Sequence, residues 1–169
     1  MELFGPADEQ YIRELSQIGV PVFLNMSPES LVDDVRKAHG RNYTNKELFR
    51  TINLCQKYNV SLNIFTMIAL AKDTAETIKQ NWKVWEQICS MNRETEDKAP
   101  IFHSFGPMVM LDPGSLAFDL PNKHGYRLIF KSLKNYISGM SLPSWHQWIS
   151  YETNYLNRGS ITKLIIDSI

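Results

Sequence analysis

The 169-residue sequence has few of the features that mark specialised protein classes. Its two cysteines, Cys55 and Cys89, are too few for a disulfide framework and too far apart for a local metal-binding loop. The 18 basic and 18 acidic side chains cancel, so no net charge attracts nucleic acid. No apolar run is long enough to cross a bilayer, and charges interrupt the N-terminal segment where a signal peptide is apolar. These absences predict a folded cytoplasmic protein with reduced, structural thiols that binds neither nucleic acid nor membranes.

Common catalytic motifs are absent as well. The four histidines do not stand at metal-binding spacing, so no metal site is predicted. No glycine-rich phosphate loop and no serine nucleophile elbow occurs. An unrelated small α/β hydrolase or transferase is therefore the last of the function classes to consider.

What is present is an alternation of helical and strand-like patterns. Thr44 and Glu47 form a capping box, and Gly19 and Asn59 stand where helices end. From residue 126 onward the pattern indicates only helices. Parallel pairing through right-handed crossovers follows, so the predicted class is α/β. The predicted strands are 20–26, 60–70 and 101–111, and the predicted helices are 6–18, 29–38, 45–58, 73–89, 128–136, 145–155 and 161–169.

Three strands are few for such an architecture, because a parallel sheet usually sets several strands side by side. The shortage fits either a small open sheet or one part of a larger βα barrel. Ligands bind at the carboxyl ends of parallel strands, which directs attention to the polar residues there. These are Ser27, Glu29, Ser30, Lys72, Asp73, Asp112 and Ser115.

Each of these residues also has a purely structural interpretation. Ser27 with Pro28 behind it suits a helix N-cap, and Glu29 in a first turn complements the helix dipole. Asp73 is a cap in the same sense, and Arg41 suits a solvated position after a helix. From the residues alone, ligand binding and capping both stay open.

Three strings carry a family resemblance. They are Leu24–Ser30, then Val35–Lys37, then His39–Thr44, and together they resemble the second half of the radical S-adenosylmethionine (SAM) barrel. The resemblance is to the group that often has a cobalamin-binding domain upstream. Glu29 and Ser30 match the family's Glu-Ser after the fourth barrel strand, and Arg41 matches its Arg. Residues 111–115, Pro121 and 123–125 resemble the segment after the sixth strand, whereas 69–74 lack the family's glycines and proline.

The resemblance implies a radical SAM iron–sulfur oxidoreductase or transferase. It places Glu29 and Ser30 at the nucleoside or ribose of S-adenosylmethionine, Arg41 at its carboxylate, and Ser27 where the family has a glycine. The family's Cys-x-x-x-Cys-x-x-Cys loop, which holds a 4Fe-4S cluster, is not in this sequence. The implied organisation is residues 1–125 as the C-terminal half of a TIM-type barrel and 126–169 as a helical extension.

Such a half barrel is expected to be inactive alone and to need the N-terminal half as its partner. In isolation it is expected to dimerise through its open edges. Cobalamin would belong to an upstream domain. The alternative function is a non-catalytic α/β binding module that docks a protein partner through aromatic C-terminal helices, with Trp145, Trp148, Tyr151 and Tyr155 as the contact residues.

Overall fold

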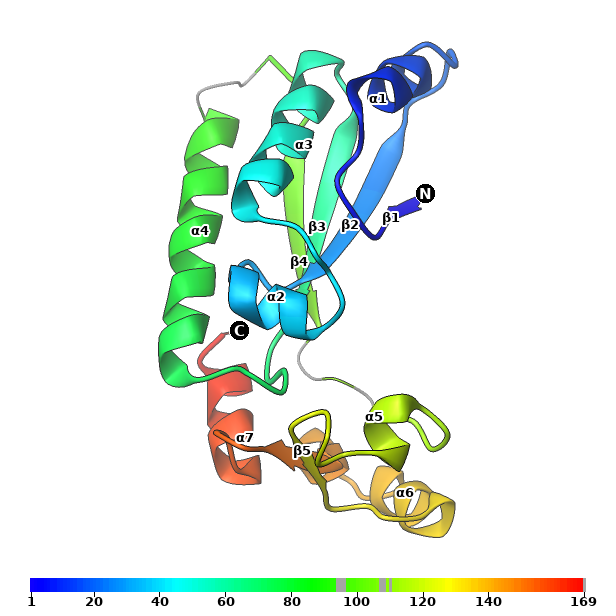
Figure 1. Ribbon diagram of the computed structural model, residues 1–169, viewed down its shortest axis with the longest axis vertical. Coiled ribbons are helices and arrows are strands. Elements are labelled where there is room, and N and C mark those ends of the chain that lie inside the picture. Colours follow the sequence, from blue (N-terminus) through cyan, green and yellow to red (C-terminus); the bar gives the residue numbers. More distant parts are fainter. Residues whose placement is uncertain (94–96, 107–108, 110, 169) are drawn as a thin grey trace. The chain divides into compact units, whose positions relative to one another are not determined.

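A computed structural model describes residues 1–93, 97–106, 109 and 111–168 (Figure 1). The chain divides into two compact units, the first formed by Met1–Thr66 with Thr77–Phe105 and the second by Met67–Glu76 with Gly106–Ile169. Parts of the predicted strand 101–111 and helix 161–169, namely residues 107, 108, 110 and 169, lie outside the described residues. Over the described ranges, every helix is too short or too polar to cross a bilayer.

The first unit is built on a four-stranded parallel sheet, which confirms the predicted α/β class. The strands lie in the order β1-β2-β3-β4, which is also their order in the chain. Right-handed crossovers between successive neighbours place all the connecting helices on one face of a sheet. The strands are β1 (Glu2–Leu3), β2 (Phe23–Glu29), β3 (Ser61–Met67) and β4 (Ile101–Gly106), and the helices are α1 (Glu9–Ser16), α2 (Asp33–Ala38), α3 (Asn45–Lys57) and α4 (Ala75–Arg93).

One face of this sheet forms the hydrophobic core. Leu24 and Met26 of β2 alternate with residues of the opposite face, as the two-residue period of a strand requires. Ile12 of α1, Ile52 of α3 and Ile88 of α4 belong to the same buried cluster, so these three helices share that face. The cluster also contains Leu48, Cys55, Leu62, Ile64 and Ile101.

The opposite face carries a row of polar side chains across three strands. Asn63 Nδ2 donates to Asn25 Oδ1 over 3.0 Å, and Ser104 Oγ donates to Asn63 Oδ1 over 3.0 Å. Beside the row, the rings of Phe23 and Phe102 lie 5.6 Å apart and are 49% and 45% exposed. This face is therefore polar along its middle and aromatic at one end.

Short-range signals in the sequence place several helix ends correctly. The Thr44 hydroxyl accepts from the Glu47 amide, and the Glu47 carboxylate accepts from the Thr44 amide, so the predicted capping box is confirmed. Asp8 caps α1, and Asn59 has a φ of 56° after α3 as expected of a left-handed terminator. These motifs are local, which is why the sequence suffices to predict them.

Two segments around β2 differ from the prediction. The strand runs from Phe23 to Glu29 rather than over 20–26, and α2 begins only at Asp33. The register of β2 against β3 shifts between Met26 and Glu29, which is a local bulge that carries the strand past Pro28. The short strand β1 pairs Leu3 with Met26 and was also not predicted.

The second unit contains an antiparallel pair of strands, so the prediction of helices alone after residue 126 is wrong. β5 (Tyr126–Leu128) pairs with β6 (Tyr151–Thr153), in company with α5 (Leu116–Asp119), α6 (Leu133–Met140), the 3-10 helix Trp145–Trp148 and α7 (Arg158–Ile166). Tyr151 is fully buried, and its hydroxyl donates to the Ala69 carbonyl 82 residues away. Such long-range contacts override a local helical pattern.

Within this unit, Gly139 of α6 lies against the ring of Phe130. A Cβ at this position would come within 2.1 Å of Phe130 Cζ and 2.3 Å of Cε2. We expect Gly139→Ala to lower the free energy of unfolding by about 2 kcal/mol, because overpacking outweighs the helix propensity gained. Urea denaturation measures the difference.

Gly159→Ala is the matched control, since Gly159 also lies in a helix but the atom nearest to a Cβ there would be Asn157 Oδ1, at 3.4 Å. That variant is expected to be neutral or slightly stabilising. Equal effects at both positions would contradict close packing of Phe130 on α6.

Candidate functional site

Glu29 ends β2 in a backbone conformation that is unusual for its residue type. Its φ is +65°, in the left-handed region, directly after the bulge. This conformation costs a non-glycine residue about 1 kcal/mol or more, and such residues concentrate at functional sites. The bulge and the positive φ together place Glu29 at the carboxyl end of β2, where parallel sheets bind ligands.

Arg41 meets Glu29 at this end of the strand. Its Nη2 lies 2.7 Å from Glu29 Oε1, and its Nε donates to the Ser27 carbonyl over 3.1 Å. The ion pair is partly shielded from water, because the two side chains are 22% and 18% exposed. The ring of Phe4 covers the guanidinium at 4.7 Å. Within the described residues the Nη1 group of Arg41 has no hydrogen-bond acceptor, so two donors remain for a ligand.

Tyr43 adds a buried hydroxyl near this pair. The residue is 4% exposed, and its ring packs under the guanidinium carbon of Arg36 at 4.9 Å. Its hydroxyl has no hydrogen-bond partner among the described residues. Burial raises the pKa of Tyr43 to about 12, while the charges of Arg36 and Arg41 oppose the increase and that of Glu29 adds to it. The group is therefore a neutral O–H donor at pH 7.

The two candidate serines direct their hydroxyls elsewhere. Ser27 Oγ donates to Glu2 Oε1 of the neighbouring strand over 2.7 Å. Ser30 is fully buried, and its Oγ donates to Asn81 Oδ1 over 3.2 Å. The capping interpretations of Ser27 and Glu29 are wrong, because both residues lie in β2 and α2 starts at Asp33. The structure brings together Glu29, Arg41 and the Ser27 carbonyl.

Arg36 is a residue whose importance sequence analysis missed. Its side chain is completely buried and donates to the carbonyls of Ser30 and Tyr43 over 3.0 Å each. It also bonds Asp33 Oδ1 at 3.1 Å and Asn45 Oδ1. These bonds hold the segment from Ser30 to Asn45, and with it the positions of Arg41 and Tyr43. A basic residue in a short helix gives no sequence signal of such burial.

Other candidates have local structural roles. Asp73 is not the residue directly before α4, which begins at Ala75, and its Oδ2 accepts from the Leu70 amide over 3.0 Å. Ser115 caps α5 by accepting from the Phe118 amide. Lys72 and Asp112 are exposed. None of these interactions requires a ligand.

Thiol chemistry is confined to two free cysteines on separate helices. Cys55 is buried in α3, where burial raises the pKa of its thiol to about 12, and Cys89 lies in α4. Across the described positions, no three histidine, cysteine or acidic side chains are grouped to hold a metal ion. The two thiols do not supply the three-thiolate set of a 4Fe-4S cluster.

The aromatic residues near the C-terminus do not form one exposed surface. Tyr151 is fully buried, whereas Tyr155 is 61% exposed. Trp148 directs its Nε1 to the Leu142 carbonyl over 2.8 Å, and Trp145 lies in the same 3-10 helix. Residues 145–155, which were predicted to be one helix, form a 3-10 helix followed by a strand. The alternative function as a docking module assumed an aromatic helix in this segment, and that helix is not formed.

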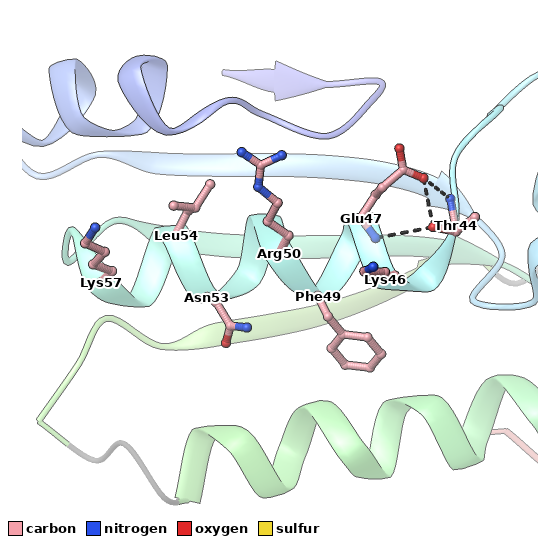
Figure 2. A pocket seen from close by; sticks show the side chains of 8 residues that line it. All are labelled: Thr44, Lys46, Glu47, Phe49, Arg50, Asn53, Leu54 and Lys57. Carbon is pink, nitrogen blue, oxygen red and sulfur yellow. Dashed lines mark hydrogen bonds between the residues drawn. The ribbon is translucent and has the colours of Figure 1, made fainter.

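A broad surface hollow of about 840 Å³ runs along α3 (Figure 2). Its polar groups are partly engaged, since Glu47 closes the capping box and Lys57 pairs with Glu9. Figure 2 shows Phe49 and Asn53 pointing away from the capping box toward the α4 side. The hollow contains none of the candidate site residues, and it joins no nucleophile to a base. Its lining is Thr44, Lys46, Glu47, Phe49, Arg50, Asn53, Leu54 and Lys57.

Comparison with known proteins adds no family assignment. No model of a protein family matches the sequence, and no curated protein matches it at a significant level.

Proposed function

We propose that this chain is the C-terminal part of a radical SAM-type barrel, and that Glu29 and Arg41 form part of its S-adenosylmethionine site. The observation that carries the proposal is the shielded Arg41–Glu29 ion pair at the carboxyl end of β2, beside a residue in a left-handed conformation. Glu29 and Arg41, two of the residues that carry the family resemblance, meet there.

The strand order supports the barrel. A sheet in which β1 to β4 lie in chain order has no reversal point, unlike a doubly wound sheet, and it is the order of consecutive strands in a βα barrel. The helices α1, α3 and α4 share one core, as the outer helices of a barrel do. The polar row Asn25–Asn63–Ser104 would then face the barrel interior.

The residues at the site fit the amino-acid end of S-adenosylmethionine. That end carries a carboxylate and an ammonium group, and the pair offers a free guanidinium edge and a carboxylate. In the family, the bound cofactor supplies a 5′-deoxyadenosyl radical. In this chain Arg41 would bind the carboxylate, Glu29 would hold Arg41 in place, and Phe4 would shield the guanidinium from water.

This chain does not have the ligands that a 4Fe-4S cluster needs. A 4Fe-4S site needs three thiolates at close spacing, and the whole sequence has two cysteines. The cluster ligands would belong to the N-terminal part of the barrel, which is the partner that the proposal requires. Oxidoreductase or transferase activity is accordingly proposed for the completed barrel.

Binding of S-adenosylmethionine to this chain tests the proposal directly. We expect millimolar or tighter binding in a titration followed by amide chemical shifts, with the largest changes at residues 27–30 and 41–43. Arg41→Gln should weaken the affinity at least tenfold, because a charge-assisted hydrogen bond to the carboxylate is lost.

Arg50→Gln is the control, since it removes an equally charged but exposed side chain on α3. It should leave the affinity unchanged. Absence of any shift at millimolar S-adenosylmethionine in the wild-type chain, or equal weakening by both substitutions, would overturn the proposed site.

A further inference from the structure

The Tyr43 hydroxyl is a buried polar group that has no hydrogen-bond partner among the described residues. Most buried polar groups in proteins are hydrogen-bonded, and an unpaired one costs free energy that a phenylalanine would avoid. Tyr43 is 4% exposed, and its ring belongs to the hydrophobic cluster beneath the sheet. The ring alone would therefore suffice for packing, and the oxygen needs a separate explanation.

Tyr43 lies near the hydrogen-bond donors of Arg36 and Arg41. Tyr43 is held close to Arg41 by the hydrogen bond from its own amide to the Arg41 carbonyl, over 2.9 Å. The Arg36 guanidinium over the ring already bonds four protein acceptors. The Nη1 group of Arg41 remains unbonded within the described residues, as does the Tyr43 hydroxyl. Two unbonded donor groups on residues two positions apart suit an anionic acceptor with two oxygens.

We propose that Tyr43 is a ligand-binding residue whose hydroxyl donates a hydrogen bond to the carboxylate that Arg41 binds. The identity of the ligand as S-adenosylmethionine rests on the proposed function. Glu29 serves as the positioning residue, because its bond to Nη2 holds the guanidinium while Nη1 stays available for the carboxylate. The hydroxyl adds selectivity for ligands that retain this group.

The inference makes a prediction about the free protein that needs no ligand. Tyr43→Phe removes only the unpaired oxygen and keeps the ring against Arg36. We expect its melting temperature to be equal to or higher than that of the wild type, because no protein hydrogen bond is lost. A hydroxyl with a structural role would give a lower melting temperature.

The decisive measurement compares two probes on two variants. S-Adenosylmethionine and its decarboxylated analogue are titrated against the wild type and Tyr43→Phe. We expect Tyr43→Phe to lower the affinity for S-adenosylmethionine about fivefold to tenfold. The affinity for the decarboxylated analogue should stay unchanged. Tyr58→Phe is the matched control, because the Tyr58 hydroxyl is engaged with Glu9 on the opposite end of α3. That variant should change neither affinity.

The outcomes separate this inference from the proposed function. If the wild type binds S-adenosylmethionine and Arg41→Gln weakens it, but Tyr43→Phe does not, then the hydroxyl binds water only and the inference is overturned while the site stands. If Tyr43→Phe lowered the affinities for both probes equally, the inference would also be overturned, because the hydroxyl would not contact the carboxylate. If the wild type binds neither probe, both proposals fall.

Discussion

Replacing Arg36 with methionine should lower the free energy of unfolding by about 4 kcal/mol. The side chain is fully buried, and methionine fills much of its volume without its donors. The carbonyls of Ser30 and Tyr43 and the amide oxygen of Asn45 would each lose a hydrogen bond inside the protein. Leaving a buried acceptor unsatisfied costs about 1–3 kcal/mol, so three of them account for an effect of this size.

Chemical denaturation of the two proteins gives this difference. Lys37→Met provides the control, because Lys37 is the adjacent residue of α2 and is exposed. Its effect should stay within about 0.5 kcal/mol, as for most surface substitutions. A loss below about 1 kcal/mol for Arg36→Met would mean that water replaces the guanidinium and that the segment from Ser30 to Asn45 is held by other contacts.

Acidification from pH 6.5 to 4 should cost up to about 3 kcal/mol of stability through His103. Burial lowers the pKa of His103 to about 4. Its Nε2 lies 2.8 Å from Thr66 Oγ1, and the ring of Trp85 lies 4.3 Å from the imidazole. The unfolded chain takes up a proton near pH 6.5 and the folded chain only near pH 4, so the unfolded state binds more protons in this window. Stability therefore falls as the pH is lowered through it.

Unfolding measured at half-unit pH steps, for the wild type and for His103→Gln, isolates this contribution. The glutamine variant should be less stable at pH 7, but its stability should change much less between pH 6.5 and 4.5. Glu9 and Glu47 also have lowered pKa values, and both variants lose their contributions together as the pH falls further. Parallel pH curves for the two proteins would show that His103 titrates normally when folded.

The sequence predicts the features of this fold that are encoded locally. The capping box at Thr44, the helix end at Asn59 and the apolar segments that overlap β2 and β3 each depend on a few neighbouring residues. The parallel α/β class follows from their order. The strands β5 and β6 were missed because their pairing joins Tyr126 and Thr153, which only the tertiary structure brings together.

In the candidate site, too, the sequence predicts some residues but not the contacts that depend on the tertiary structure. Glu29 and Arg41 were selected by resemblance, and their ion pair joins residues 12 positions apart across a helix and a turn. Ser30 was selected with them, yet its hydroxyl bonds Asn81 of α4, 51 positions away. The burial of Arg36 and the unpaired oxygen of Tyr43 depend on how several segments close around them. Residue type and spacing do not show how distant segments pack around a side chain.

The polar row on the sheet also limits how the strands can be misaligned during folding. Asn25, Asn63 and Ser104 alternate with Leu24, Leu62 and other core residues along their strands. Sliding one strand by a single residue would turn its amide into the hydrophobic core and its leucine out to the row. The slip would break the hydrogen bonds of the row and bury an unsatisfied amide, at a cost of several kcal/mol. The row thus makes misaligned strand pairings less stable than the native register, independent of any ligand that the face receives.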